Sequence, residues 1–571
     1  MSRRRSLVLL LVTFIILATI YSVVIPLGEA PDEVSHLQYV QQLLARHRLP
    51  TLDIAAGEAH QPPLYYALGA LLIAGIPNPQ IEILANPDWQ LWNLDTPNLL
   101  LHTRQEQFPF ENGALAWHLL RLFSVALGAV TIWATYWLAL EFFPNDPWLA
   151  LASAAFVAFI PAFTFLSAVV NNDNLVITLS AVALLVFFRT LRGARVLLLG
   201  CLGLLLGLAA LAKISALALW FPIGVAMLLG WHSGWRCNRF VSIAIVFGVA
   251  LMLVAPWLIY NQLAFGDPLN SAYMLRYSTP RAAPMTLADW GIYATRMFES
   301  LWGKFGGAVS LVMPLIVYQV LSIFVVLGFI GALPQFDDWR KGRMPRPAQL
   351  GWVISIMFWG LLAAAQIRLM LTMMGMDQAR QIFAGLPSLS IFIVAGILRL
   401  SLQRRKLAAI ILTIGMGLVG IAALYFATSI YAPRYASPSI ASAAAPIDFG
   451  GQIRVLDYRI EPAQVARGES ISVQIDWQAV RDVTENDWLM LQLVGANEAS
   501  VQQEGVPSNG RTTTDWWRTG QVFSSQHIIA VPTEIALGKY QVRLGLHPFG
   551  RWEWLPVRGG EFFTLATVEV R

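Results

Sequence analysis

Two adjacent carboxylates, Asp32 and Glu33, are the first residues in this sequence whose type and position suggest chemistry. They follow Pro31, which suits the first position of a helix, and a helix N-terminus favours ionised acids. Either acid could accept a proton from a hydroxyl or bind a divalent cation, and His36 lies one helical turn beyond them. Helix-start preference alone would also explain the pair, because acids there stabilise the helix dipole.

A second polar cluster contains Glu58, His60 and Gln61, just before an apolar segment that begins at Pro63. An ordinary loop leading into a helix explains these residues about equally well. Four side chains from the two clusters could share a divalent cation: Glu33, His36, Glu58 and His60. The sequence does not establish such a metal site, because the spacing matches no standard ligand pattern.

Two more polar sites interrupt apolar runs further along the chain. Four consecutive polar residues, 171–174, include Asp173, and helix capping would account for only part of this group. Arg380 lies at the mouth of a later run, where it could bind a phosphate bidentately or extend to a lipid headgroup. The chain also has five cations that basic-cluster topology does not explain: Lys213, Arg276, Arg281, Arg296 and Lys304. An anionic ligand would explain them.

The composition indicates that the lipid bilayer is the solvent for most of this chain. Hydrophobic residues make up 56% of the sequence and charged residues only 13%, which water-soluble domains rarely show. The net charge of +5 comes from short basic clusters between apolar runs, a pattern that argues against nucleic acid as a partner. The sequence contains no P-loop, Rossmann fingerprint, Gly-x-Ser-x-Gly elbow or paired Cys/His spacing.

The apolar runs predict a polytopic α-helical membrane protein with about eleven transmembrane helices. A first run ends near residue 26, and the others lie near 115–140, 147–166, 174–190, 195–211, 214–231, 240–262, 309–332, 350–374, 378–400 and 406–428. With a cytoplasmic N-terminus, most clustered Lys and Arg residues fall on the cytoplasmic side. We therefore expect a multi-pass protein of the cell (plasma) membrane with an extracytoplasmic C-terminal domain.

The same pattern predicts two domains. Residues 1–446 form the transmembrane domain, with large outer loops at 27–114 and 263–308. In the first loop, an amphipathic segment at 32–44 and an apolar segment at 63–76 are expected to lie along the membrane surface. From 447 to 571 the hydrophobic period becomes two, as in Ile471, Val473 and Ile475, which predicts a β-sandwich.

These features resemble the GT-C glycosyltransferases, in particular the protein O-mannosyltransferase and aminoarabinose-transferase group. Asp32 and Glu33 match the acidic pair that follows the first helix in that group, and the stretch from Gln61 to Tyr66 resembles its Lys-Pro-Pro-Leu-Tyr-Tyr element. Further matches are the following: Arg121, Asp173, residues 255–268, and Arg380 at a common Arg-Tyr position. The likeness covers roughly residues 6–430. It departs from the group where Gln61 replaces Lys, where Gln381 replaces Tyr, and where residues are inserted between Ile76 and Leu115.

The resemblance implies transfer of a sugar from a polyprenyl-phosphate donor in the membrane, with inversion, on the outer side. It implies catalytic roles for Asp32 and Glu33. It further implies that an acceptor or cation is oriented by His36, His60 and Asp173, and that the donor phosphate is bound by Arg380, Gln61 and Arg276. The acceptor, whether glycan, lipid or protein, stays open, as does a divalent cation. The alternatives are a transporter or flippase of lipid-linked sugars, which predicts charges in mid-membrane, and a scaffold for the β-domain, which leaves the acids unexplained.

Overall fold

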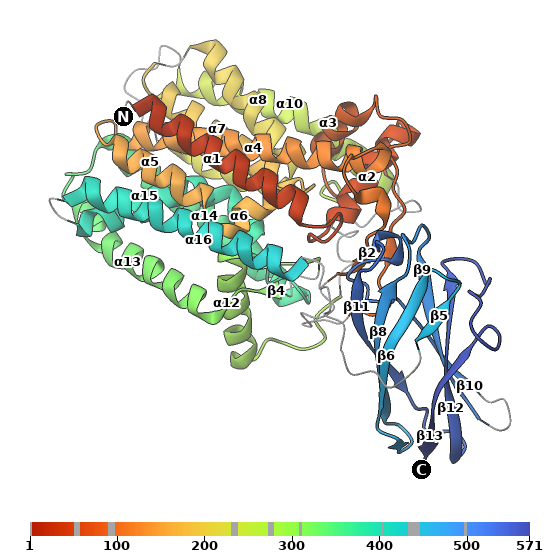
Figure 1. Cartoon of the computed structure of the whole chain (residues 1–571). Helices are drawn as coiled ribbons and strands as arrows, with labels where there is room; N and C mark the ends of the chain where they lie inside the picture. The colour runs from red at the N-terminus through yellow and green to blue at the C-terminus, as the bar shows by residue number, and fades with distance from the viewer. Residues whose placement is uncertain are drawn as a thin grey trace.

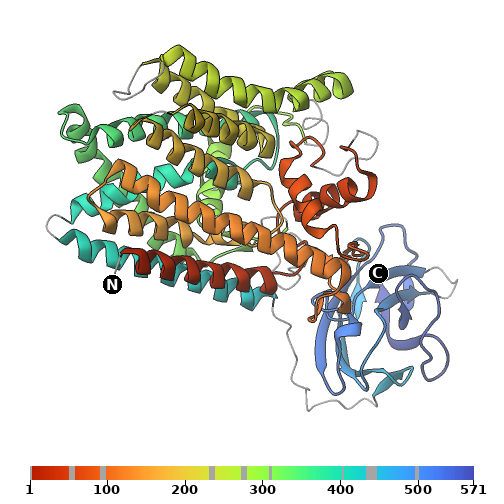
Figure 2. The same cartoon turned by 90° about the horizontal axis from the view of Figure 1, so that it is seen from above.

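The computed structural model shows a helical bundle joined to a C-terminal β-domain (Figure 1). It describes residues 3–50, 58–89, 98–193, 195–229, 238–271, 279–307, 311–401, 404–431, 446–495 and 500–571. The helices run roughly alongside one another, and the β-domain lies at one end of the bundle (Figure 2). The fold class predicted from the sequence, a polytopic helical membrane protein with a C-terminal β-domain, is confirmed.

Each predicted apolar run forms a helix or a pair of helices. The bundle consists of α1 (Arg3–Val24), α4 (Asn112–Phe142), α5 (Pro147–Ala158), α6 (Pro161–Leu166), α7 (Asp173–Thr190), α8 (Val196–Ala212), α9 (Leu217–Leu228), α10 (Arg239–Phe265), α13 (Leu315–Arg340), α14 (Arg346–Thr372), α15 (Leu386–Leu400) and α16 (Arg405–Tyr431). The 3₁₀ helices η3 (Ile214–Ala216) and η4 (Ala379–Gly385) precede α9 and α15.

Within the described residues, eight helices are long and apolar enough to cross a membrane, fewer than the eleven expected. The other three predicted runs form shorter helices, and the chain itself gives the reason. Pro161 starts the new helix α6 shortly after α5 ends, because proline suits the first turn of a helix and disrupts its interior. Lys213 has an extended backbone and separates α8 from η3.

The outer surface of the bundle is as apolar as its interior. On α1, Phe14 and Tyr21 are fully buried, whereas Leu9 and Ile16 on the opposite face are 56% and 55% exposed. Large exposed side chains continue on other helices, including Phe329 on α13 at 73%. An apolar surface this extensive is stable only against lipid.

The two ends of the bundle differ in charge. At one end, ion pairs join Arg192 to Glu141 over 2.6 Å and Arg405 to Asp146 over 3.1 Å. Asp173, at the start of α7, lies at the opposite end, because α7 runs from Asp173 to Thr190. The first outer loop and the β-domain are found at that same end (Figure 2). Which end faces the cytoplasm stays a prediction from the basic clusters.

The two outer loops carry short elements of their own. The first contains α2 (Glu33–Arg46), α3 (Leu64–Ile73), β1 (Leu84–Ala85), β2 (Leu100–Leu101) and η2 (Arg104–Glu106). The second contains α12 (Leu287–Trp302) and β3 (Lys304–Phe305), and β4 (Leu311–Val312), which pairs with β3, follows this loop. The amphipathic segment predicted at 32–44 is α2, which buries Leu37 and Val40 completely. That α2 and α3 lie along a membrane surface stays a prediction.

The C-terminal domain is a sandwich of two sheets. Its elements are β5 (Ile447–Phe449), β6 (Ile453–Glu461), β7 (Gln464–Val465), β8 (Ser470–Ala479), β9 (Asp487–Val494), β10 (Ser500–Gly505), η6 (Thr514–Trp516), β11 (Val522–Ala530), β12 (Gly538–Pro548) and β13 (Phe563–Val570). One sheet has the order β10-β9-β12-β13-β7 and the other the order β11-β8-β6-β5. Alternate side chains such as Trp477, Leu491 and Leu544 are fully buried and form the core, as a period of two requires.

Close packing of α13 on α15 gives a first prediction. A Cβ added at Gly331 would lie 2.3 Å from the carbonyl carbon of Gly396, so the helices touch through their backbones there. Gly331→Ala should therefore lower the thermal stability of the detergent-solubilised protein, since overpacking costs about 1–3 kcal/mol. Gly360→Ala on α14 is the matched control, because a Cβ there has no heavy atom within 4 Å. Equal effects of the two substitutions would contradict this close contact.

Candidate active site

Asp32 does not cap the helix that follows it. It is the N-cap residue of α2, yet its side chain makes no capping hydrogen bond, and its backbone is left-handed with φ of 61°. A non-glycine residue in this region is uncommon, and such strain often accompanies function. The carboxylate instead pairs with the guanidinium of Arg380. Helix-start preference therefore does not explain Asp32.

Arg380 connects Asp32 to a second acid. It lies on η4, and its Nη1 donates to Oδ2 of Asp173 over 3.2 Å. Oδ1 of Asp173 accepts from Nζ of Lys213, which follows α8, over 2.5 Å. The four side chains form a row of alternating charge, Asp32, Arg380, Asp173 and Lys213, drawn from four separate elements. Because both cations already pair with carboxylates, an incoming anion has to compete with Asp32 and Asp173 for them.

The row of charges has one solvent-accessible end. The Asp32 side chain is 46% exposed, whereas those of Arg380 and Asp173 are 14% and 3% exposed. Confinement among these buried groups opposes ionisation of Asp32, but Arg380, His36 and Lys213 outweigh it and lower its pKa below the ordinary value of 3.8. Asp32 is therefore a carboxylate at neutral pH, and it is the group of the row that an acceptor can reach.

The polar stretch 171–174 is buried and holds this end of the bundle together. Nδ2 of Asn172 donates to Oε1 of Gln61 over 3.1 Å, and the backbone N–H of Asn171 donates to the hydroxyl of Tyr65 over 3.1 Å. Nδ2 of Asn171 and Oδ1 of Asn172 are buried without a hydrogen-bond partner among the described residues. Unsatisfied buried polar groups are rare in folded proteins, which is consistent with a ligand-binding role for this stretch.

His36, on α2, and His60 and Gln61, just before α3, lie near the row of charges. His36 is 1% exposed, and its Nδ1 forms a hydrogen bond of 2.9 Å with the hydroxyl of Tyr66. Burial lowers the pKa of His36 in spite of the nearby Glu58 and Asp32, so this imidazole is neutral at physiological pH. Nε2 of His60 lies 3.1 Å from Nε2 of Gln61. These three residues therefore lie in the region that the sequence indicated. The roles expected for them stay predictions.

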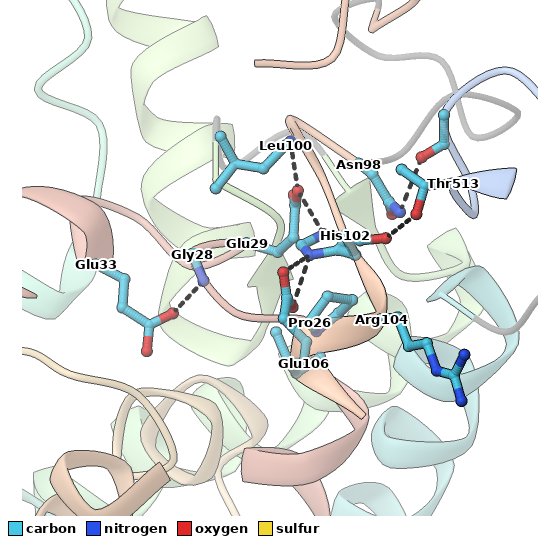
Figure 3. Close-up of polar contacts among 12 residues, drawn as sticks. Pro26, Gly28, Glu29, Glu33, Asn98, Leu100, His102, Arg104, Glu106 and Thr513 are labelled. Atoms are coloured by element: carbon cyan, nitrogen blue, oxygen red, sulfur yellow. Dashed lines mark hydrogen bonds and ion pairs between the residues drawn. The ribbon is translucent and has the colours of Figure 1, made fainter. Parts of the chain in front are cut away.

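Glu33 does not face the site, contrary to the expectation that the two acids of the pair act together. It is fully buried, and its carboxylate accepts two hydrogen bonds from Arg121, at 2.7 and 2.8 Å. It also accepts from the backbone N–H groups of Gly28 and Val170, at 3.1 and 3.0 Å, the first of which is drawn in Figure 3. With its acceptor sites filled, Glu33 has the surroundings of a structural acid and not of a base or metal ligand.

The other candidate ligands do not form a metal centre in the part of the chain that is described. No three His, Cys, Asp or Glu side chains there lie close enough to hold a metal ion. Glu33 is engaged with Arg121, and His36 with Tyr66. Arg276, expected to bind phosphate, lies outside the described residues. Lys213, one of the five cations that basic-cluster topology does not explain, pairs with Asp173. In the sequence, Lys213 is a single cation within a long apolar stretch. A charge in such a position is costly in a membrane unless it has a partner.

An apolar cavity of about 430 Å³ is lined partly by η4, the element that also carries Arg380 of the charged row. Its wall includes Trp302 of α12, Phe329 of α13, Trp359 of α14 and Phe392 of α15. Ile382 of η4 also lines it, two residues beyond Arg380. The short helix η4 therefore presents a cation to the polar site and an apolar side chain to the cavity.

The central helices match a known family. Residues 114–260 match the family model of the dolichyl-phosphate-mannose-protein mannosyltransferases. The resemblance to GT-C glycosyltransferases is confirmed for this segment. The segment extends from α4 to α10 and contains Arg121, Asp173 and Lys213. The search of curated proteins returned no match.

Two solved structures were also compared. The crystal structure of ArnT from Cupriavidus metallidurans in the apo state is 14% identical, with 75% of this chain and 78% of that chain covered and a TM-score of 0.44. The alkylpurine DNA glycosylase AlkC of Pseudomonas fluorescens, bound to DNA with an abasic site analogue, is 12% identical, with 76% and 99% covered and a TM-score of 0.16. With TM-scores below 0.5, neither likeness identifies the fold or the function.

The different surroundings of the two adjacent acids predict different effects on stability. Glu33→Gln should destabilise the protein by about 3–5 kcal/mol, because it leaves the buried guanidinium of Arg121 without its counter-charge. Asp32→Asn should change stability little, since Asp32 is half exposed and Asn tolerates a left-handed backbone. Thermal unfolding followed by tryptophan fluorescence measures both variants. An equal loss of stability in Asp32→Asn would contradict this assignment.

Proposed function

We propose that this protein transfers a sugar from a polyprenyl-phosphate donor to an acceptor hydroxyl, at the end of the bundle that carries the first outer loop. The observation that carries the proposal is the position of η4, which joins a charged site to an apolar cavity. A lipid-linked sugar carries a charged phosphate and an apolar tail in one molecule. Its binding site therefore needs a charged part and an apolar part close to each other. The match to mannosyltransferases that use dolichyl-phosphate-mannose supports a donor of this class.

The donor phosphate binds between Arg380 and Lys213. Both cations are held by Asp173, at 3.2 and 2.5 Å, so they are positioned before the donor arrives. A guanidinium binds phosphate oxygens bidentately, and an ammonium adds a point charge. The isoprenoid tail lies in the cavity lined by Trp302, Phe329 and Phe392. Gln61 does not supply the charge of the Lys it replaces, and Lys213 compensates for it.

Asp32 acts as the general base. In the absence of donor it pairs with Arg380, which lowers its pKa and makes it a weak proton acceptor. A phosphate that binds Arg380 competes with Asp32 for the same guanidinium, which raises the basicity of the carboxylate when the sugar is present. Asp32 then takes the proton from the acceptor hydroxyl.

The reaction is a displacement at the anomeric carbon. The acceptor oxygen forms a bond to that carbon, its proton passes to Asp32, and the bond to the lipid phosphate oxygen breaks with inversion. The lipid phosphate leaves with the electron pair, and Arg380 and Lys213 stabilise its charge. Because a screened phosphate leaves without protonation, one carboxylate suffices where glycoside hydrolases need two.

A transporter or flippase fits these positions less well. Such proteins place charged groups near the middle of the membrane. Here Asp173 begins α7, Lys213 follows the end of α8, and Arg380 precedes α15. The charges thus lie at the ends of helices, where a lipid headgroup is found. The basic clusters at the other end support an extracytoplasmic position for this site.

The reaction predicts the effect of removing the base. Asp32→Asn should reduce turnover by about 10²–10⁴-fold, the usual contribution of a general base, because the amide accepts no proton. Purified protein is incubated with radiolabelled polyprenyl-phosphate sugars, and loss of label from the lipid is measured alongside equilibrium donor binding. Donor affinity should be retained or increased, since Arg380 and Lys213 remain and the Asp32 carboxylate no longer competes for Arg380. Wild-type turnover in Asp32→Asn would remove the central residue of the mechanism.

The cavity predicts discrimination by lipid length. Ala332→Trp should fill part of the cavity that Ala332 lines and raise KM for a long-chain donor, while a donor with a short prenyl chain is affected much less. Leu333→Trp is the matched control, because Leu333 is 71% exposed on the outside of the same helix. An equal rise in KM for long and short donors would place the tail elsewhere.

A further inference from the structure

A buried cluster of charge lies within the first outer loop, where that loop contacts the β-domain and outside the proposed active site. It consists of Glu29, His102 and Glu106 (Figure 3). Nδ1 of His102 lies 2.9 Å from Oε2 of Glu106, and Nε2 lies 3.3 Å from Oε1 of Glu29. Glu29 is fully buried and His102 is 4% exposed. Both ring nitrogens therefore face carboxylates in a site that excludes water.

The surroundings of His102 favour the imidazolium. Burial opposes protonation, but Glu106 and Glu29 outweigh it and raise the pKa of His102 to about 10. At neutral pH one cation thus lies between two anions, and Oε2 of Glu29 has no hydrogen-bond partner among the described residues. Buried ion pairs are weak contributors to stability, and a role in fixing one arrangement is the better-supported use. The contacts on the two sides of this cluster indicate which arrangement it fixes.

On one side, the cluster is joined to the β-domain. The backbone carbonyl of His102 accepts from the hydroxyl of Thr513 over 2.6 Å, and the backbone N–H of Arg104 donates to Asp515 over 2.7 Å. Leu101 packs on Trp488 and Val506 of the β-domain. These contacts fasten the segment 98–106 of the first outer loop to the β-domain.

On the other side, the cluster holds the turn that carries Asp32. Oε1 of Glu29 accepts from the backbone N–H of Leu100 over 2.8 Å, which ties the turn to β2. The next residue back, Gly28, has φ of 82°, and a Cβ there would lie 2.5 Å from the side chain of Leu100. Gly28 also donates to Glu33 over 3.1 Å. Glu29 is three residues before Asp32, whose left-handed backbone requires such support.

We propose that His102 is a positioning residue that makes the β-domain part of the active site. By holding Glu29 against β2, His102 transmits the docking of the β-domain to the turn from Gly28 to Asp32. The β-domain thereby sets the placement of the general base and the rate of transfer. This inference rests on the proposed sugar transfer for its readout.

The test uses the full-length protein and the radiolabelled polyprenyl-phosphate sugar that the wild type consumes. His102→Gln keeps a hydrogen-bonding side chain without the charge, and Thr513→Val removes the contact from the β-domain side. Each should lower kcat by roughly 10- to 100-fold, the effect of misplacing a catalytic group by about 1 Å. Equilibrium donor binding should stay at the wild-type value, because Arg380 and Lys213 are untouched. If His102 and Thr513 only stabilised the fold, these substitutions would lower kcat and donor binding together.

Two comparisons make the result decisive. Tyr540→Phe is the matched control, since Tyr540 is buried in the β-domain near the start of β12 and its hydroxyl donates to the backbone carbonyl of Ala536. It should keep wild-type kcat, and an equal loss there would overturn the inference. The double variant Glu29→Gln/His102→Gln should be no slower than the slower single variant, because the two act as one unit.

The failure of this inference differs from the failure of the proposed function. If Asp32→Asn loses turnover while His102→Gln and Thr513→Val keep it, the positioning role alone is wrong. If His102→Gln does not fold, Thr513→Val decides the matter. If Asp32→Asn turns over donor like the wild type, the proposed function itself is wrong.

Discussion

The arrangement of the site depends on one buried ion pair, between Glu33 and Arg121. Both side chains are completely buried. Arg121 donates two hydrogen bonds to Glu33 and three to the backbone carbonyls of Ser22, Ile25 and Pro26. A buried pair offsets its desolvation only when nearly every donor and acceptor is used, as here. The pair therefore fixes the end of α1, the start of α2 and the middle of α4 relative to one another as a single unit.

This pair also explains why two neighbouring acids differ so much. Asp32 has a left-handed backbone just before Glu33, the first helical residue, and the two side chains reach different partners, Arg380 and Arg121. Glu33 points into the bundle and completes the shell around Arg121. Asp32 is left at the surface, held in a left-handed conformation and directed to Arg380. Their adjacency in the sequence suggested a shared role, whereas the structure gives the two side chains different partners and different exposure.

Patterns local in sequence predicted the fold well. Apolar runs located the helices, and the period of two located strands such as β8 and β12. The site was only partly predictable, because its members come from α2, α7, η4 and the end of α8. Asp173 and Arg380 were singled out because they interrupt apolar runs, and Asp32 because it belongs to an acidic pair at a predicted helix start. Lys213 as the partner of Asp173, and His102 as the partner of Glu29, follow from tertiary packing, which no spacing rule encodes.

In the proposed reaction, Arg380 pairs first with the base, Asp32, and then with the leaving group, the lipid phosphate. A carboxylate paired with a guanidinium is a weak base, so Asp32 does not activate water efficiently while the donor is absent. The donor phosphate offers the guanidinium a second bidentate partner, and Asp173 keeps Arg380 in place during the exchange. The Asp32 carboxylate makes no capping hydrogen bond to α2, so α2 does not hold it once the phosphate occupies Arg380. The released carboxylate is therefore free to face the acceptor, and activation of the base is coupled to the presence of the sugar.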